Sequence, residues 1–95
     1  MSSETIVSAT FPSAGRATAA VDWFLNQSID RDAVTVQVML PGERPRPPRA
    51  GDNRRADLTW LVAIDFARAR LRERTAIETM RREGGSVVRQ TTAGM

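Results

Sequence analysis

The chain lacks three of the residue types on which most enzyme sites depend, because it contains no cysteine, no histidine and no lysine. Without cysteine there are no disulfides, thiolate nucleophiles or cysteine-based metal centres. Without histidine, the commonest general base and transition-metal ligand are missing. The absence of lysine removes Schiff-base chemistry and the P-loop lysine. Catalysis would have to rest on Asp, Glu, Ser, Thr and Arg, so we predict that the protein is not an enzyme.

Targeting and metal-binding signals are also missing from the sequence. The first residues, "MSSETIVSATF", do not show the basic and then apolar pattern of a signal peptide. No apolar run approaches the roughly 20 residues that a membrane-spanning helix needs. Asp30 and Asp32 are closely spaced, but two carboxylates without a glycine turn do not make a calcium loop. We therefore expect a soluble cytoplasmic protein with no membrane partner, no metal and no bound cofactor.

The positive charge is carried entirely by arginine. Fourteen arginines against 11 acidic residues give a net charge of +3, which is too small to require a polyanionic partner. The placement of the arginines along the chain is therefore more informative than their number. A length of 95 residues predicts one domain with a single modest core.

The first half of the chain predicts a strand, a helix and a strand. Residues 5–11 ("TIVSATF") form a short β-branched run, and Ser13 is placed to cap a helix over residues 14–26. Residues 33–40 alternate strictly, which predicts a strand with one apolar face. The apolar stripe of the helix is Ala17, Ala20, Val21 and Phe24. The apolar face of the second strand is Val34, Val36, Val38 and Leu40.

The second half repeats this order. Residues 58–66 ("LTWLVAIDF") are apolar nearly throughout, as in a central strand. Residues 70–83 predict a helix with an apolar stripe of Ala76, Ile77 and Met80, and the two glycines that follow predict its end. Residues 86–90 predict a last strand, and residues 91–95 a mobile tail.

Two successive β-α-β halves with short internal connections predict an α+β, ferredoxin-like fold. Right-handed crossovers place both helices on one face of a four-stranded antiparallel sheet. The expected spatial order of the strands, numbered along the chain, is 4-1-3-2. Residues 41–57 ("PGERPRPPRAGDNRRAD") then join two adjacent strands. Such a long hairpin loop is expected to be either functional or disordered.

Both halves resemble the bacterial general-stress, or heat-induced stress, protein domain. "TFPSAGRATAAVDWFLNQSIDRDAVTVQV" matches its strand, short turn, alanine-rich helix and valine-rich strand. "ADLTWLVAIDFARARLRERTAIETMRREGGSVV" is similar to its second half. The chain departs from that family in "NQSID", where a glycine is common, and in its Pro/Arg-rich centre. The resemblance implies a small, non-enzymatic, stress-associated module and supplies no catalytic residues.

The arginines of the 41–57 loop are candidate phosphate contacts, because clustered basic residues attract nucleic acids without sequence preference. Three acidic residues in the same stretch reduce its charge to +2, and no aromatic residue is present there to stack on bases. The alternatives are a solvated linker and, for "RPRPP", a polyproline II ligand. The candidate residues are Arg44, Arg46, Arg49, Arg54 and Arg55.

The outer face of the sheet is a candidate interface. If the valines of the second strand face the helices, Thr35, Gln37 and Met39 face outward, and the third strand adds apolar residues to that face. An exposed apolar patch tends to be covered by a partner. We predict a surface that includes Met39, Trp60 and Leu61 and that forms a two-fold homodimer or binds a protein partner.

Three functions follow, in order of preference. The first is a stress-associated interaction module that binds itself or another protein. The second is a nucleic-acid-binding module that uses the loop arginines. The third is an enzyme of the dimeric α/β-barrel type, which would need a cavity with a polar group between helices and sheet.

Overall fold

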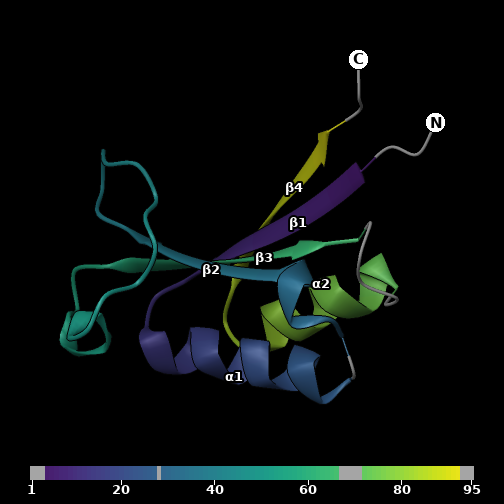
Figure 1. Ribbon diagram of the computed structural model, residues 1–95, viewed down its shortest axis with the longest axis horizontal. Helices are drawn as coiled ribbons and strands as arrows, with labels where there is room; N and C mark the ends of the chain where they lie inside the picture. Colours follow the sequence, from purple (N-terminus) through teal and green to yellow (C-terminus); the bar gives the residue numbers. More distant parts are fainter. Residues whose placement is uncertain (1–3, 28, 67–71, 93–95) are drawn as a thin grey trace.

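The computed structural model describes residues 4–27, 29–66 and 72–92 (Figure 1). The elements along the chain are β1 (Glu4–Phe11), α1 (Ala14–Asn26), the 3-10 turn η1 (Arg31–Ala33), β2 (Val34–Met39), the 3-10 turn η2 (Asp52–Arg54), β3 (Thr59–Asp65), α2 (Glu73–Arg82) and β4 (Ser86–Thr92). None of the helices in these described residues is long and apolar enough to cross a membrane.

The described strands form one antiparallel sheet in the order β2-β3-β1-β4. This order is the predicted one, and it confirms the α+β, ferredoxin-like architecture. Both helices lie on the same side of the sheet, and the other side has no described element packed over its length (Figure 1). The fold is therefore a two-layer structure with one open sheet face.

The core lies between the sheet and the helices because the strands alternate. In β3, Trp60, Val62 and Ile64 are buried, whereas the residues between them are half-buried. The valines of β2 and Val7, Ala9 and Phe11 of β1 face the same way, as the predicted alternation requires. The largest fully buried side chains are Phe11, Phe24, Ile64, Met80, Val7, Val38, Val62 and Thr79.

The first helix begins and ends where the sequence predicts. Ser13 has an extended backbone, and its Oγ accepts a hydrogen bond of 3.3 Å from the Arg16 N–H. This bond satisfies one of the amide groups that a helix leaves unpaired at its start.

The second helix begins later than predicted. Arg72 is extended (φ −69°, ψ 132°), so helical structure starts at Glu73 and not at residue 70; residues 70 and 71 lie outside the described residues. The buried residues of the helix are Ala76, Thr79 and Met80. The helix ends at Arg82, and Gly84 takes the left-handed conformation (φ +87°) that favours glycine.

The last strand is longer than predicted. β4 runs to Thr92, which pairs with Glu4, so the first two residues of the expected tail belong to the sheet. The extra pairing follows from β1, whose own N-terminal residues extend beyond the end of β3. Residues 93–95, the rest of the expected tail, lie outside the described residues.

Candidate functional site

The open face of the sheet carries a shallow hollow. We use the name "open face" for the side chains that line this hollow of about 490 Å³, which lies on the side of the sheet away from α1 and α2. They are Ile6, Ser8, Thr10, Asp32, Thr35, Gln37, Met39, Leu61, Ala63 and Asp65. The predicted interface residues Met39 and Leu61 are both among them.

The middle of the open face is uncharged. Leu61 lies on β3 between Thr10 of β1 and Gln37 of β2, and Ala63 lies between Ser8 and Thr35 in the next row. Small hydroxyl and amide groups thus flank apolar side chains. The carboxylates of Asp32 and Asp65 line the hollow at the end where β2 begins and β3 ends.

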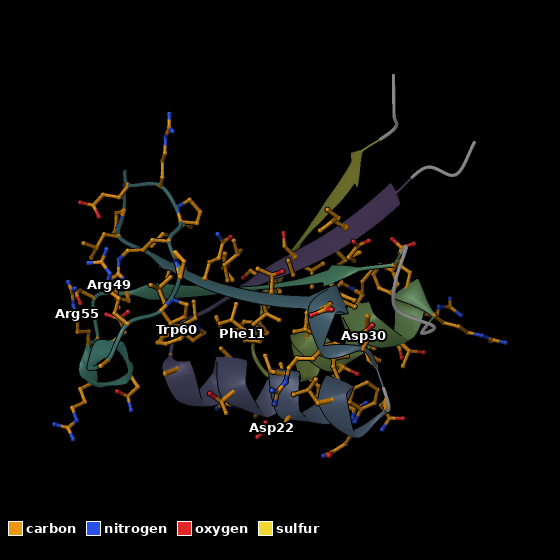
Figure 2. The ribbon with its side chains drawn as sticks, viewed as in Figure 1. Phe11, Asp22, Asp30, Arg49, Arg55 and Trp60 are labelled. Atoms are coloured by element: carbon orange, nitrogen blue, oxygen red, sulfur yellow. The ribbon has the colours of Figure 1, made fainter. Side chains whose placement is uncertain are left out.

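Trp60 does not belong to the open face, which corrects one of the predicted interface residues. Its side chain is only 8% exposed and belongs to the core. Trp60 pairs with Phe11 on one side and Val38 on the other, and both of these residues are buried as well. Figure 2 shows Trp60 and Phe11 between the sheet and α1. The alternation of β3 decides this, because Trp60 and Leu61 must point to opposite faces.

The 41–57 loop is folded, and a salt bridge holds it together. The Arg46 guanidinium donates two hydrogen bonds to the Asp52 carboxylate, with N···O distances of 2.9 and 3.2 Å. The Arg49 N–H donates a further bond of 2.6 Å to Asp52 Oδ2. The Arg46 side chain and the Arg49 amide together lower the pKa of Asp52 to about 2. The loop is therefore arranged around a carboxylate that stays ionised at any ordinary pH.

The same loop covers part of the sheet edge. Val38 and Arg46 exchange two backbone hydrogen bonds of 2.9 Å, so Arg46 pairs with β2 on the side away from β3. An unpaired strand edge is a template for pairing with another chain, and this bridge covers it at Val38. Arg46 is thus a structural residue of the loop.

The predicted phosphate contacts separate into two groups. Arg46 pairs with Asp52, and Arg55 pairs with Asp57 through hydrogen bonds of 2.6 and 3.0 Å, which lowers the pKa of the Asp57 carboxyl. In the described part of the chain no ion pair involves Arg44, Arg49 or Arg54, and all three side chains are exposed. These three remain available to an external anion.

In the described part of the chain, apolar side chains form a core between the helices and the sheet, where an α/β-barrel enzyme would have its polar cavity. The buried hydroxyl of Thr79 donates to the Thr75 carbonyl oxygen at 2.9 Å. The hollow lies on the other side of the sheet. The Asp30 side chain accepts a hydrogen bond of 3.0 Å from the Asp32 N–H within the turn before β2. Among the described residues, no group of three or more acidic side chains could hold a metal ion.

Asp52, the carboxylate around which the loop folds, was not singled out from the sequence. In the sequence it is one of three acidic residues that reduce the charge of the loop. Its partner Arg46 is six residues earlier, a separation with no regular periodicity in a loop. The sequence offered one signal for Asp52: it is an aspartate that follows a glycine and lies between arginines.

No protein-family model matches the chain, and neither the curated proteins nor the solved structures include a match. The resemblance to general-stress domains therefore stays a prediction.

Proposed function

We propose that the protein is a small, non-catalytic interaction module that associates with a second copy of itself through the open face. The observation that carries this proposal is that α1 and α2 leave the apolar residues of that face uncovered: Leu61 and Ala63 at its centre, and Ile6 and Met39 toward its ends. In the stress-associated role that the family resemblance implies, the protein would act as a dimer or as part of a larger assembly.

The composition of the open face supports a protein interface. Interfaces between proteins are depleted of charged residues at their centre and are surrounded by polar groups. Here the centre carries Leu61 and Ala63, with hydroxyl and amide side chains beside them and carboxylates at one end. The arginines of the described loop do not line the hollow, and the middle of the face around Leu61 and Ala63 is uncharged.

The open face does not have the chemistry of an RNA-recognition sheet. That type of sheet stacks bases on aromatic side chains of its two central strands. At the equivalent positions, β1 and β3 carry Ser8, Thr10, Leu61 and Ala63 on the open face, and Trp60 points into the core. A protein surface, and not a base, is the ligand that fits.

Oligomeric state tests the proposal. Sedimentation velocity between about 10 μM and 1 mM should show a reversible monomer–dimer equilibrium. Ala63→Glu places a charge at the centre of the open face and should abolish the dimer, because desolvating an unpaired carboxylate is costly. The matched control is Ala19→Glu, which makes the same change at an exposed position of α1. A wild-type protein that stays monomeric at 1 mM, or equal effects of the two variants, would refute the proposal.

A second candidate function, nucleic-acid binding, is favoured by Arg44, Arg49 and Arg54. Their exposed side chains make no ion pair in the described part of the chain. Changing only these three to serine preserves Arg46 and Arg55, which the loop uses internally. Salt-dependent binding of duplex DNA or single-stranded RNA that the triple variant loses would support this function. Fluorescence anisotropy at 20 and 150 mM salt is the measurement, and no binding at 20 mM would exclude it.

A further inference from the structure

The loop between β2 and β3 contains a proline segment, residues 44–48 ("RPRPP"), whose conformation follows from its composition. The ring of a proline fixes φ at about −65°. A residue that precedes a proline is confined to extended conformations. Every residue of the segment is a proline or precedes one, so the segment is extended, and none of it is helical in the structure.

The fold holds this proline segment at Arg46. The N–H and the carbonyl oxygen of Arg46 form hydrogen bonds of 2.9 Å with Val38 of β2. The Arg46 guanidinium is bonded to Asp52, which also accepts a bond from the N–H of Arg49, the next residue after the segment. The segment is thus attached to the protein along one side, and its shape is set before any partner binds.

The prolines of the segment face solvent. Pro45, Pro47 and Pro48 are exposed, whereas Arg46 is half-buried. Within the described residues, no hydrogen bond reaches the carbonyl oxygen of Pro45 or of Pro48. An extended proline-rich chain has three residues per turn, so Pro45 and Pro48 lie on the same side of it. That side offers two proline rings and two unbonded acceptors.

A partner cannot recognise this segment by adding a β-strand to it. In an antiparallel pair, successive residues direct their backbone groups alternately toward and away from the paired strand. Arg46 directs its N–H and carbonyl toward Val38, so residues 45 and 47 direct theirs away from β2. Both are prolines and have no N–H to donate. Polyproline recognition does not need these donors, because it uses proline rings and carbonyl acceptors.

We infer that the proline segment is a docking site for a second protein, a domain whose groove is lined by aromatic side chains. Such grooves pack aromatic rings against prolines, and their Trp N–H and Tyr O–H groups donate to carbonyl oxygens. A segment already held extended loses little conformational entropy on binding, which favours the complex. The inference goes beyond self-association, because the segment does not line the open face. The module would join a second copy of itself to a different protein.

Titration with domains that bind polyproline ligands tests the inference. The full chain, isotope-labelled for NMR, is titrated with a panel of purified SH3 and WW domains. At least one domain should bind, with chemical shift changes confined to loop amides such as those of Arg46 and Arg49. Pro45→Ala combined with Pro48→Ala should raise the dissociation constant at least about tenfold, because both proline rings of one side are lost. The control is Pro12→Ala, which changes an exposed proline between β1 and α1 and should bind as wild type does.

The outcomes separate proline recognition from charge and from self-association. Undiminished binding by the double proline variant, or no binding by any domain at about 1 mM, would overturn the inference. Binding that is retained in the proline variant but lost when Arg44, Arg49 and Arg54 become serine would also overturn it, since charge would then be recognised. A wild-type chain that binds a domain but never dimerises would refute only the proposed function. Circular dichroism of each variant confirms that the fold is retained.

Discussion

Arg46 and Asp52 face each other across the loop between β2 and β3 and form a two-bond ion pair, with N···O distances of 2.9 and 3.2 Å. The Asp52 side chain is only 6% exposed, whereas that of Arg46 is 26% exposed. Arg46 also pairs through its backbone with Val38 of β2. One arginine therefore connects the loop to both the sheet edge and the carboxylate at its centre.

The Asp52 carboxylate should make stability depend on pH in the acid range. Its pKa in the folded protein is about 2, below the ordinary value of 3.8, because Arg46 and the Arg49 amide stabilise the charged form. The ion pair thus contributes fully above about pH 4, and the contribution is lost as the pH falls through about 2. The melting temperature of Asp52→Asn should be lower than that of wild type at pH 5. The two melting temperatures should become equal by about pH 1.5.

Thermal melts of both proteins from pH 5 to pH 1.5 measure this difference. Asp57→Asn is the control, because Asp57 pairs with Arg55 in an exposed position. It should show a smaller difference at pH 5. A constant gap between wild type and Asp52→Asn over the whole range would contradict the prediction.

Removing the guanidinium should open the loop without unfolding the sheet. Arg46→Met leaves the buried Asp52 carboxylate without its main partner, which favours local opening. Trypsin cleaves after arginine but poorly before proline, so the Arg49–Ala50 bond is the informative site. Mass spectrometry should show severalfold faster cleavage there than in wild type. Arg44→Met, which removes an exposed arginine, should leave the rate unchanged.

Gly85 should not tolerate a side chain. A Cβ at this position would lie 2.8 Å from the Phe11 ring and 2.9 Å from the Met80 carbonyl oxygen. Phe11 is buried, so it has no space into which to move. Gly85→Ala should lower the free energy of unfolding by about 1–3 kcal/mol, the usual cost of overpacking.

Chemical denaturation of Gly85→Ala and Gly15→Ala compares the crowded glycine with an open one. A Cβ at Gly15, within α1, would meet nothing within 4 Å. Gly15→Ala should be neutral or stabilise by up to about 1 kcal/mol, because alanine loses less entropy in a helix. Equal stability of the two variants would show that the approach of Phe11 to residue 85 is not tight.

The N-cap of α1 should account for a measurable part of the stability. Ser13→Ala removes the acceptor for the Arg16 N–H and should cost about 0.5–2 kcal/mol. Ser13→Asp keeps an acceptor and adds a negative charge at the helix start, so it should retain wild-type stability. Urea denaturation gives the free energy of unfolding of both variants. A loss in Ser13→Ala but not in Ser13→Asp would show that the hydrogen bond, and not substitution at this position as such, stabilises the helix.

The sequence specified the elements of the fold closely because their signals are local. The alternation of β2 and β3 and the cap at Ser13 predict the boundaries of both strands and of α1 to within one residue. The start of α2 and the end of β4 were less predictable. The end of β4 depends on how far β1 extends beside it, since Thr92 pairs with Glu4.

The candidate site was predicted only in part. The alternation correctly places Thr35, Gln37 and Met39 together on the face away from the core. Trp60 was assigned to the wrong face, because a strand that is apolar on both sides does not reveal which of its faces packs on the helices. The direction became clear only from the burial of Phe11 and Val38 beside it.

The sequence by itself determined the order of elements, the topology and the chemistry that the chain lacks, because periodicity, caps and composition are properties of single segments. Only the tertiary structure decided which arginines of the loop are engaged, because the Arg46–Asp52 pair forms when the loop folds back onto β2. It also decided that the polar side chains of three strands meet around Leu61 and Ala63 in one hollow. Such groupings depend on strand register and loop path, which join residues far apart in the chain.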